Sequence, residues 1–191
     1  MRKKVVLLGD SIRLLGYGER VAELLMEGNY EVFQPQENCR FVKFTLRGLW
    51  DWRKSIDGCD VVHWNNGLWD TCIHLYGDGI PFTELNEYVE NMVRVAKILK
   101  KMSKRVIFAT TTPVVPDCEY HENNVIEQYN AAVVPKLQEL GVEINDLNKL
   151  VKENLSRYIC EDKVHLSKEG SEVCAKQVFK CITQTGNCDD K

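Results

Sequence analysis

The sequence lacks any apolar run long enough to cross a membrane, since no stretch approaches the roughly 18 apolar residues that a spanning helix needs. The run near its start has four apolar residues, Val5-Val6-Leu7-Leu8, before it meets Gly9-Asp10-Ser11. Such a run is too short for the apolar region of a signal peptide. We therefore expect a cytoplasmic protein with no membrane partner.

Charge of one sign is also scarce, because the net charge is −3 while 28% of the residues are charged. The only basic run, residues 100–105, falls where a helix is expected to end, and cations there complement the helix dipole. Nucleic-acid-binding domains usually carry a basic face instead. The charge pattern therefore predicts no nucleic-acid partner.

Cysteine is present, but its spacing lacks the signature of a metal site. The eight cysteines include no Cys-x-x-Cys pair, and the four histidines are scattered. Gly16-Tyr17-Gly18 also lacks the rest of a dinucleotide-binding fingerprint. We therefore expect no metal and no organic cofactor, and reduced cysteines that mostly pack as small apolar side chains.

Linkers, repeats and low-complexity segments are absent as well. A chain of 191 residues without them is most simply one domain, which we place at residues 1–184. Residues 185–191 form a polar tail. The sequence predicts no oligomeric state.

Short apolar segments alternate with longer amphipathic ones along the chain. The former predict strands at residues 4–8, 30–34, 59–64, 105–110 and 142–144. The latter predict helices at residues 13–26, 41–56, 83–102 (capped by Thr83), 123–140, 145–154 and, after the cap Ser167, up to 183. This alternation predicts a flavodoxin-like three-layer α/β/α sandwich around a five-stranded parallel sheet in the order 2-1-3-4-5.

Polar residues follow the predicted strands at the edge where such sheets bind ligands. Ser11 follows the first strand, Cys39 the second and Asn65 the third, while Asp162 and His165 precede the last helix. A serine nucleophile needs a histidine base, and the base needs an acid to fix its tautomer. Taken singly, Ser11 could only cap a helix and His165 could be a surface residue, but together with Asp162 they predict a catalytic triad.

Two sequence blocks around these residues resemble those of the SGNH hydrolases, also called GDSL-type esterases and lipases. Gly9-Asp10-Ser11-Ile12 is similar to the first block of that family, with isoleucine for the usual leucine. The last block is matched by residues 162–170, including Gly170 after the histidine. The resemblance runs from about residue 4 to 183. It implies a serine esterase with Ser11, His165 and Asp162 as nucleophile, base and acid.

The same resemblance implies an oxyanion hole formed by the N–H of Ser11, the N–H of Cys39 and the side-chain amide of Asn65. Two family glycines are replaced, one by Cys39 and one by His63, and Asn66 stands where the family has aspartate. The placement of Cys39 rests on counting back from the helix that follows. A packing role for Cys39 is the alternative.

The substrate implied is a carboxylic ester, with a short acyl group such as acetyl on a carbohydrate or another small alcohol. The alternatives are a lysophospholipase or thioesterase with the same triad, and a binding protein of this fold that has lost activity. Four residues are candidates for contact with the substrate: Asp10, His63, Trp64 and Trp69. By contrast, Asp117, Glu119, His121 and Glu122 are predicted to form a solvated turn rather than a site.

Overall fold

The computed structural model describes residues 2–184. Its centre is a parallel sheet whose strands follow the order β2-β1-β3-β4-β5, which confirms the predicted topology. Val6 of β1 lies between Phe33 of β2 and Val62 of β3, so β1 is paired on both sides. The strands are β1 (Lys4–Leu8), β2 (Glu31–Phe33), β3 (Cys59–Asn65), β4 (Ser103–Ala109) and β5 (Glu143–Asn145).

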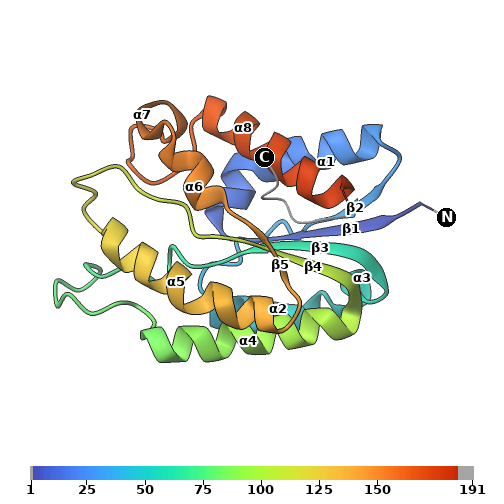
Figure 1. Ribbon diagram of the computed structural model, residues 1–191, viewed down its shortest axis with the longest axis horizontal. Coiled ribbons are helices and arrows are strands. Elements are labelled where there is room, and N and C mark those ends of the chain that lie inside the picture. Colours follow the sequence, from blue (N-terminus) through green and yellow to red (C-terminus); the bar gives the residue numbers. More distant parts are fainter. Residues whose placement is uncertain (1, 185–191) are drawn as a thin grey trace.

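Helices cover both faces of the sheet, as Figure 1 shows. The lower layer in that view holds α2 (Val42–Asp51), α3 (Arg53–Ile56), α4 (Leu85–Met102) and α5 (Asn123–Glu139). The upper layer holds α1 (Gly18–Glu27), α6 (Leu147–Lys152), α7 (Leu155–Tyr158) and α8 (Lys168–Thr183). The long loops that follow β3 and β4 extend at the left of the view, beyond the carboxyl ends of the strands.

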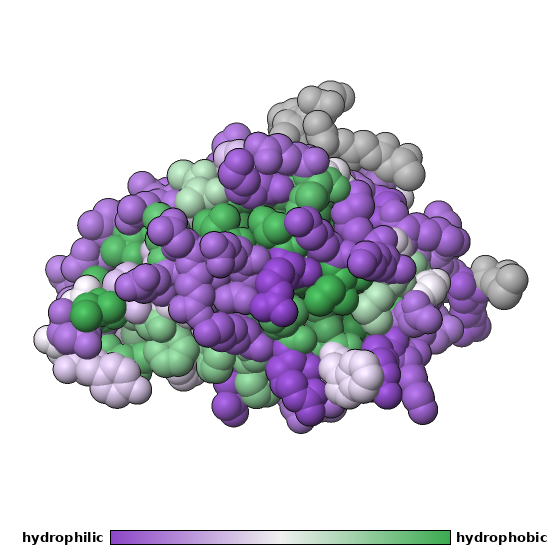
Figure 2. Space-filling view, turned by 90° about the horizontal axis from the view of Figure 1, so that it is seen from below, coloured by the Kyte–Doolittle hydropathy of each residue, from purple (hydrophilic) through white to green (hydrophobic). Residues whose placement is uncertain are grey.

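Two apolar cores hold these layers together, one on each face of the sheet. Side chains alternate along a strand, so Val61 faces the core beneath α1 and α8, whereas Val62 faces the core beneath α2, α4 and α5. Both side chains are at most 4% exposed. Figure 2 views the α4 side of the molecule and shows hydrophilic residues interleaved with hydrophobic ones outside this buried layer.

Element boundaries differ from the predictions at several places. The helix predicted at 41–56 is divided into α2 and α3, and the strand predicted at 105–110 begins at Ser103. Thr83 does not cap α4, because its hydroxyl donates to Asp70 and the helix begins after Glu84. The predicted helix at 145–154 begins two residues later and is followed by the short helix α7. The first helix opens with a π-helical segment, η1 (Ile12–Tyr17), before α1. Each difference follows from a tertiary contact or a local backbone geometry that periodicity does not report.

Several predictions are not decided by this architecture. The tail at 185–191 lies outside the described residues, and the domain boundary and cytoplasmic location stay predictions. Among residues 2–184, no helix combines the length and the apolar character required for a membrane span. Six cysteines in that part of the chain are free thiols: Cys39, Cys59, Cys72, Cys118, Cys160 and Cys174.

Candidate active site

Ser11 lies between the end of β1 and η1, at the carboxyl edge of the sheet. Its Oγ is 2.9 Å from Nε2 of His165, although the two residues are 154 positions apart. Ser11 is 8% exposed and lines a cavity. Gly9, two residues before Ser11, packs closely against Asn65 at the end of β3. A Cβ at Gly9 would lie 2.0 Å from Oδ1 of Asn65, so this approach requires glycine.

His165 is held by the turn that leads into α8. Its Nδ1 lies 2.6 Å from Oδ2 of Asp162, and its carbonyl accepts the backbone N–H of Cys160 at 2.8 Å. Because an ionised carboxylate only accepts, Nδ1 carries the proton and Nε2 is left to accept from Ser11. Lys163 adopts a left-handed conformation with φ 67°, which closes the turn between acid and base. The structure thus brings together the three residues predicted to form the triad.

Asp162 remains ionised although part of its side chain is removed from water. Burial acts to raise the pKa of Asp162, but the hydrogen bonds that it accepts outweigh burial and hold the pKa below its usual range. Oδ1 accepts from the Cys160 thiol at 3.0 Å and from the backbone N–H groups of Val164 and His165 at 2.9 and 2.8 Å. An ionised Asp162 can both orient the imidazole and stabilise its protonated form.

The glycine of the last sequence block has a packing role close to this turn. A Cβ on Gly170 would lie 2.1 Å from the carbonyl oxygen of Tyr158. Ser167 caps α8 as predicted, with its hydroxyl accepting the N–H of Gly170 at 3.0 Å. The start of α8 therefore packs directly against the chain before the triad turn, which fixes the position of His165.

Asn65 ends β3 beside the nucleophile turn and is 4% exposed. Its Nδ2 donates to Oδ1 of Asp10 at 2.7 Å, and its Oδ1 accepts from the hydroxyl of Tyr17 at 2.8 Å. One of the two Nδ2 hydrogens is thus engaged by Asp10. The second is not engaged by the described residues, and its donation to an oxyanion at Ser11 stays a prediction.

Asp10 is buried at 1% exposed and does not face a substrate, so its predicted substrate contact is wrong. Its carboxylate instead accepts the backbone N–H of Ile12 at 2.9 Å and the amide of Asn65. Burial raises the pKa of Asp10 to about 6, while the Ile12 and Asn65 hydrogen bonds and the charge of Arg13 act in the opposite direction. Asp10 therefore holds Asn65 and the backbone of the nucleophile turn in place.

Cys39 is wrongly predicted as an oxyanion donor. Its backbone N–H donates to the carbonyl of Gly9 at 3.1 Å, and its thiol sulfur accepts the N–H of Gly9 at 3.3 Å. The residue is fully buried. Cys39 thus joins the second loop to the nucleophile turn, which is the packing role that the sequence left as the alternative.

Arg13 strengthens the same connection, although its position in the sequence predicts no such role. Its guanidinium is buried and donates to the carbonyls of Gly9 at 3.3 Å, Pro35 at 3.1 Å and Glu37 at 2.8 Å. An arginine within a helix directly after the nucleophile gave no sequence signal of burial. The loop after β2 is therefore fastened to the nucleophile turn by a buried cation.

Asn66 and Asp70 hold the loop after β3. The amide of Asn66 accepts from Thr45 at 2.7 Å and donates to the carbonyl of Arg40 at 2.7 Å. The Asp70 carboxylate accepts the N–H of Val42 at 3.1 Å, at the start of α2, and is fully buried. Asn66 thus uses both its acceptor and its donor to hold this loop.

A cavity of about 400 Å³ opens above the triad. Trp69 lines it and is 38% exposed, and its contact with a substrate stays a prediction. His63 and Trp64 are fully buried, so their predicted substrate contact is wrong. The other residues that line the cavity are Ser11, Leu15, Asn38, Leu68, Cys72, Leu75, Tyr120, His121, Val164 and His165.

His63 and Trp64 point to opposite faces of β3 because side chains alternate along a strand. The ring of Trp64 packs on Phe108 with centroids 5.1 Å apart, and its indole N–H donates to Asn66. The ring of His63 meets Tyr17 edge-on, and its Nε2 lies 3.1 Å from Nδ2 of Asn145. Burial lowers the pKa of His63 to about 3, so this histidine is neutral.

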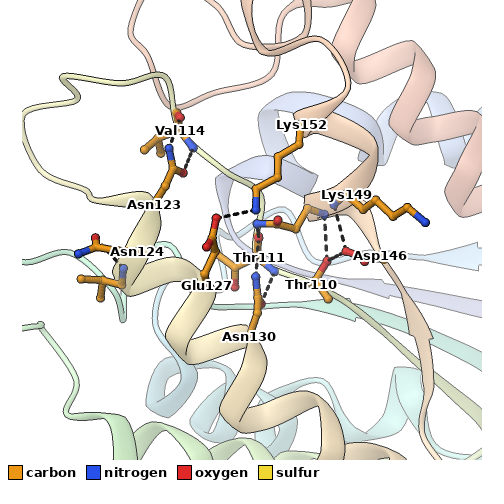
Figure 3. A network of polar contacts seen from close by, with 12 residues as sticks. Thr110, Thr111, Val114, Asn123, Asn124, Glu127, Asn130, Asp146, Lys149 and Lys152 are labelled. Carbon is orange, nitrogen blue, oxygen red and sulfur yellow. Dashed lines mark hydrogen bonds and ion pairs between the residues drawn. The ribbon is translucent and has the colours of Figure 1, made fainter.

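His121 belongs to the cavity rather than to a solvated turn, contrary to the sequence prediction. Burial lowers its pKa to about 4, and the charges of His165 and His74 act in the same direction. Figure 3 shows how the segment before it is fixed: the amides of Asn123 and Asn130 each form two hydrogen bonds with the backbone, at Val114 and Thr111 respectively. The loop after β4 is thereby tied to α5.

The chain is similar in sequence to two known proteins. No protein-family model matches the chain. It is 25% identical to the GDSL esterase/lipase CPRD49 of Arabidopsis thaliana, over 96% of this chain and 80% of that protein. It is 27% identical to the GDSL esterase/lipase WDL1 of Oryza sativa subsp. japonica, over 65% of this chain and 53% of that protein.

Solved structures share the fold over almost the whole chain. Axe2, an acetylxylan esterase from Geobacillus stearothermophilus, superposes with a TM-score of 0.75 at 19% identity, covering 96% of this chain and 95% of Axe2. A lipase/acylhydrolase from Enterococcus faecalis gives a TM-score of 0.79 at 17% identity, with 95% of each chain covered. These likenesses show the fold, and the polar residues described above occupy its ligand-binding edge.

Proposed function

We propose that the chain is a serine esterase of the SGNH (GDSL) type, in which Ser11 cleaves carboxylic esters through an acyl-enzyme. The observation that carries this proposal is the continuous hydrogen-bonded path from Ser11 Oγ to His165 Nε2 and from His165 Nδ1 to Asp162. The same path argues against the alternative of an inactive binding protein, for which no such alignment is needed.

In the first step, Nε2 of His165 takes the hydroxyl proton as Ser11 Oγ attacks the ester carbonyl carbon. The tetrahedral intermediate collapses when the bond to the alcohol oxygen breaks and His165 returns the proton to that oxygen. Water then attacks the acyl-enzyme with His165 again acting as base, which releases the acid and restores Ser11. Asp162 stabilises the imidazolium in both steps.

The oxyanion would rest on two donors, the backbone N–H of Ser11 and the free hydrogen of the Asn65 amide. The N–H of Cys39 is excluded because Gly9 already accepts it. Both remaining donors lie at the edge of the sheet next to the reacting hydroxyl. No metal or organic cofactor takes part in this sequence of steps.

We further propose that the substrate is a small ester with a short acyl group, such as acetyl, on a carbohydrate or another small alcohol. Trp69 and Tyr120 support this proposal, because exposed aromatic rings beside the triad offer faces on which a sugar can pack. The fold shared with Axe2, which is named as an acetylxylan esterase, agrees with it. The apolar walls of the cavity, among them Leu15, Leu68 and Leu75, favour a second candidate, an ester with a longer acyl chain such as that of a lysophospholipid or thioester.

Labelling with a fluorophosphonate tests the nucleophile. We expect the wild-type protein to be labelled and to hydrolyse nitrophenyl acetate, whereas Ser11→Ala should lose both the labelling and the hydrolysis. Ser156→Ala, a change at an exposed serine of α7, is the matched control and should behave as wild type. Labelling that persists in Ser11→Ala would assign the nucleophile elsewhere.

A series of substrates separates the two ester classes. Rates for nitrophenyl esters from acetyl to decanoyl, together with acetate release from acetylated xylooligosaccharides, report acyl length and alcohol in one comparison. A maximum at acetyl with release from the sugar supports the first candidate. A maximum at longer chains supports the second.

A further inference from the structure

The orientation of the Asn65 amide decides whether this residue can donate to an oxyanion. An asparagine presents a donor on one side and an acceptor on the other, and a rotation by 180° exchanges them. Only one orientation directs an N–H at the negative oxygen that forms above Ser11. Some neighbouring group must therefore distinguish the two ends of the amide.

Two buried partners make this distinction. Asp10 accepts from Nδ2 at 2.7 Å, and the hydroxyl of Tyr17 donates to Oδ1 at 2.8 Å. An ionised carboxylate cannot donate, so Asp10 requires the nitrogen on its own side. The oxygen then faces Tyr17, whose hydroxyl supplies the matching hydrogen. One hydrogen on Nδ2 remains for the oxyanion.

Tyr17 reaches Asn65 because of the unusual geometry of the first helix. It is the last residue of the π-helical segment η1, and Gly16 before it has non-helical dihedrals of φ −105° and ψ −106°. Gly18 after it packs closely, since a Cβ there would lie 2.6 Å from the carbonyl of Arg13. π-helical turns inside α-helices are rare and frequently occur at functional sites.

The phenol of Tyr17 is fully buried, so its hydroxyl needs a partner within the protein. The edge-on contact with His63, at a centroid distance of 5.7 Å, fixes the ring beside β3. His63 stands where the family has glycine, and a glycine would leave this side of the ring unsupported. The replacement at residue 63 is thus structurally linked to the contact at Asn65.

We propose that Tyr17 is a positioning residue for ester hydrolysis, whose hydroxyl holds the Asn65 amide in the orientation that stabilises the oxyanion. This inference rests on the proposed function, in which Asn65 donates to that oxygen. Tyr17 itself does not contact the reacting atoms. Its effect on the rate must therefore pass through Asn65.

A double-mutant cycle tests this dependence, using kcat and KM of Tyr17→Phe, Asn65→Ala and the double variant on nitrophenyl acetate. Asn65→Ala removes a donor and should lower kcat by about 10²–10³. Tyr17→Phe removes one hydrogen bond and should lower kcat by about tenfold with little change in KM. In the Asn65→Ala background, Tyr17→Phe should change kcat by less than about twofold.

Tyr129→Phe provides the matched control for removal of a buried tyrosine hydroxyl. Tyr129 is 1% exposed, and its hydroxyl donates to the carbonyl of Thr83 at 2.6 Å, away from Asn65. Its kcat should stay near that of wild type. Thermal unfolding of each variant sets an assay temperature well below the lowest Tm, so that loss of folded protein does not enter the comparison.

Three results would overturn the inference. An unchanged kcat in Tyr17→Phe would show that the hydroxyl is not needed. Equal effects of Tyr17→Phe with and without Asn65 would show a general structural role. An unaffected kcat in Asn65→Ala would remove the oxyanion role itself, and this result is distinct from failure of the Ser11→Ala test, which concerns the nucleophile.

Discussion

His165 and Asp162 occupy one turn before α8, whereas Asn65, Asp10 and Tyr17 come from β3, from the loop after β1 and from η1. The side chains of His165 and Asp162 are 33% and 49% exposed. Asn65, Asp10 and Tyr17 are at most 4% exposed. The base side of the site is thus local and exposed, and the oxyanion side is assembled from distant segments and buried.

Because of this difference, substitutions on the two sides should affect the catalytic rate and the free energy of unfolding to different extents. A change on the exposed turn removes a catalytic group but leaves few buried contacts behind. A change on the oxyanion side leaves buried polar groups without partners, which lowers stability by roughly 1–3 kcal/mol for each such group. Activity and stability should therefore respond differently on the two sides.

Asp162→Asn should lower activity more than any change on the oxyanion side, and it acts on the exposed turn. An amide at residue 162 favours the wrong tautomer of His165, and kcat should fall by about 10⁴. The free energy of unfolding should fall less than in Arg13→Met, because the side chain is 49% exposed and the Oδ1 of asparagine can still accept the two backbone N–H groups. Steady-state kinetics and urea denaturation measure the two quantities.

Glu161→Gln, an exposed neutralisation one residue away, is the control for Asp162→Asn and should retain wild-type kcat. A loss of kcat that is similar in both variants would mean that charge near the turn, rather than the contact with His165, supports the rate. The loss of kcat could then not be assigned to the contact between Asp162 and His165.

Arg13→Met should give the largest effect on stability, and it acts on the buried side. Three carbonyls lose a charged donor and buried Asp10 loses a neighbouring positive charge, so the free energy of unfolding should fall by about 3–5 kcal/mol. The kcat of the folded protein should fall far less than in Asp162→Asn. Arg20→Met, at a partly exposed arginine paired with Glu23 and Glu172, should lower the free energy of unfolding far less than Arg13→Met does.

Equal unfolding free energies for Arg13→Met and Arg20→Met would show that the hydrogen bonds from the buried Arg13 guanidinium do not stabilise the loop after β2. In that case the loop after β2 would be held by Cys39 and Asn66 without help from the guanidinium. Urea denaturation monitored by tryptophan fluorescence gives both values under the same conditions.

Asp70 sharpens the comparison through pH. Burial raises the pKa of Asp70 to about 7, against 3.8 for an ordinary aspartate, while hydrogen bonds from Thr83 and Val42 act in the opposite direction. The folded protein therefore binds this proton more tightly than the unfolded chain does. The stability that it gives is complete below the unfolded pKa and is lost as the pH rises through about 7.

Asp70→Asn removes this titration, and Asp10 titrates in both proteins. The free energy of unfolding of the wild type minus that of Asp70→Asn should therefore decline between about pH 4 and pH 7 and then level off. Urea denaturation at several pH values measures the difference. A difference that rises over this range would reverse the sign and show that the ionised form of Asp70 stabilises the fold.

Periodicity and motif spacing were sufficient for the sheet order and for the three triad residues, because both follow from short-range patterns. They failed for Cys39, whose N–H was assigned by counting along a loop and is in fact engaged by Gly9. They also failed for Arg13 and Asp70, since charged residues are expected at the surface unless a partner is known. Burial of a charge depends on contacts that sequence distance does not report.

By itself the sequence determined the alternating strands and helices, the serine at a strand end and the acid–base pair three residues apart. Each of these depends on neighbours along the chain, through side-chain alternation, helical period or the reach of one turn. Tertiary structure alone decided the orientation of Asn65, the burial of His63 and Trp64 and the place of His121 in the cavity. These features depend on which groups from distant segments exclude water together, and the hydrogen bonds of a buried amide can be assigned only when all its partners are in position.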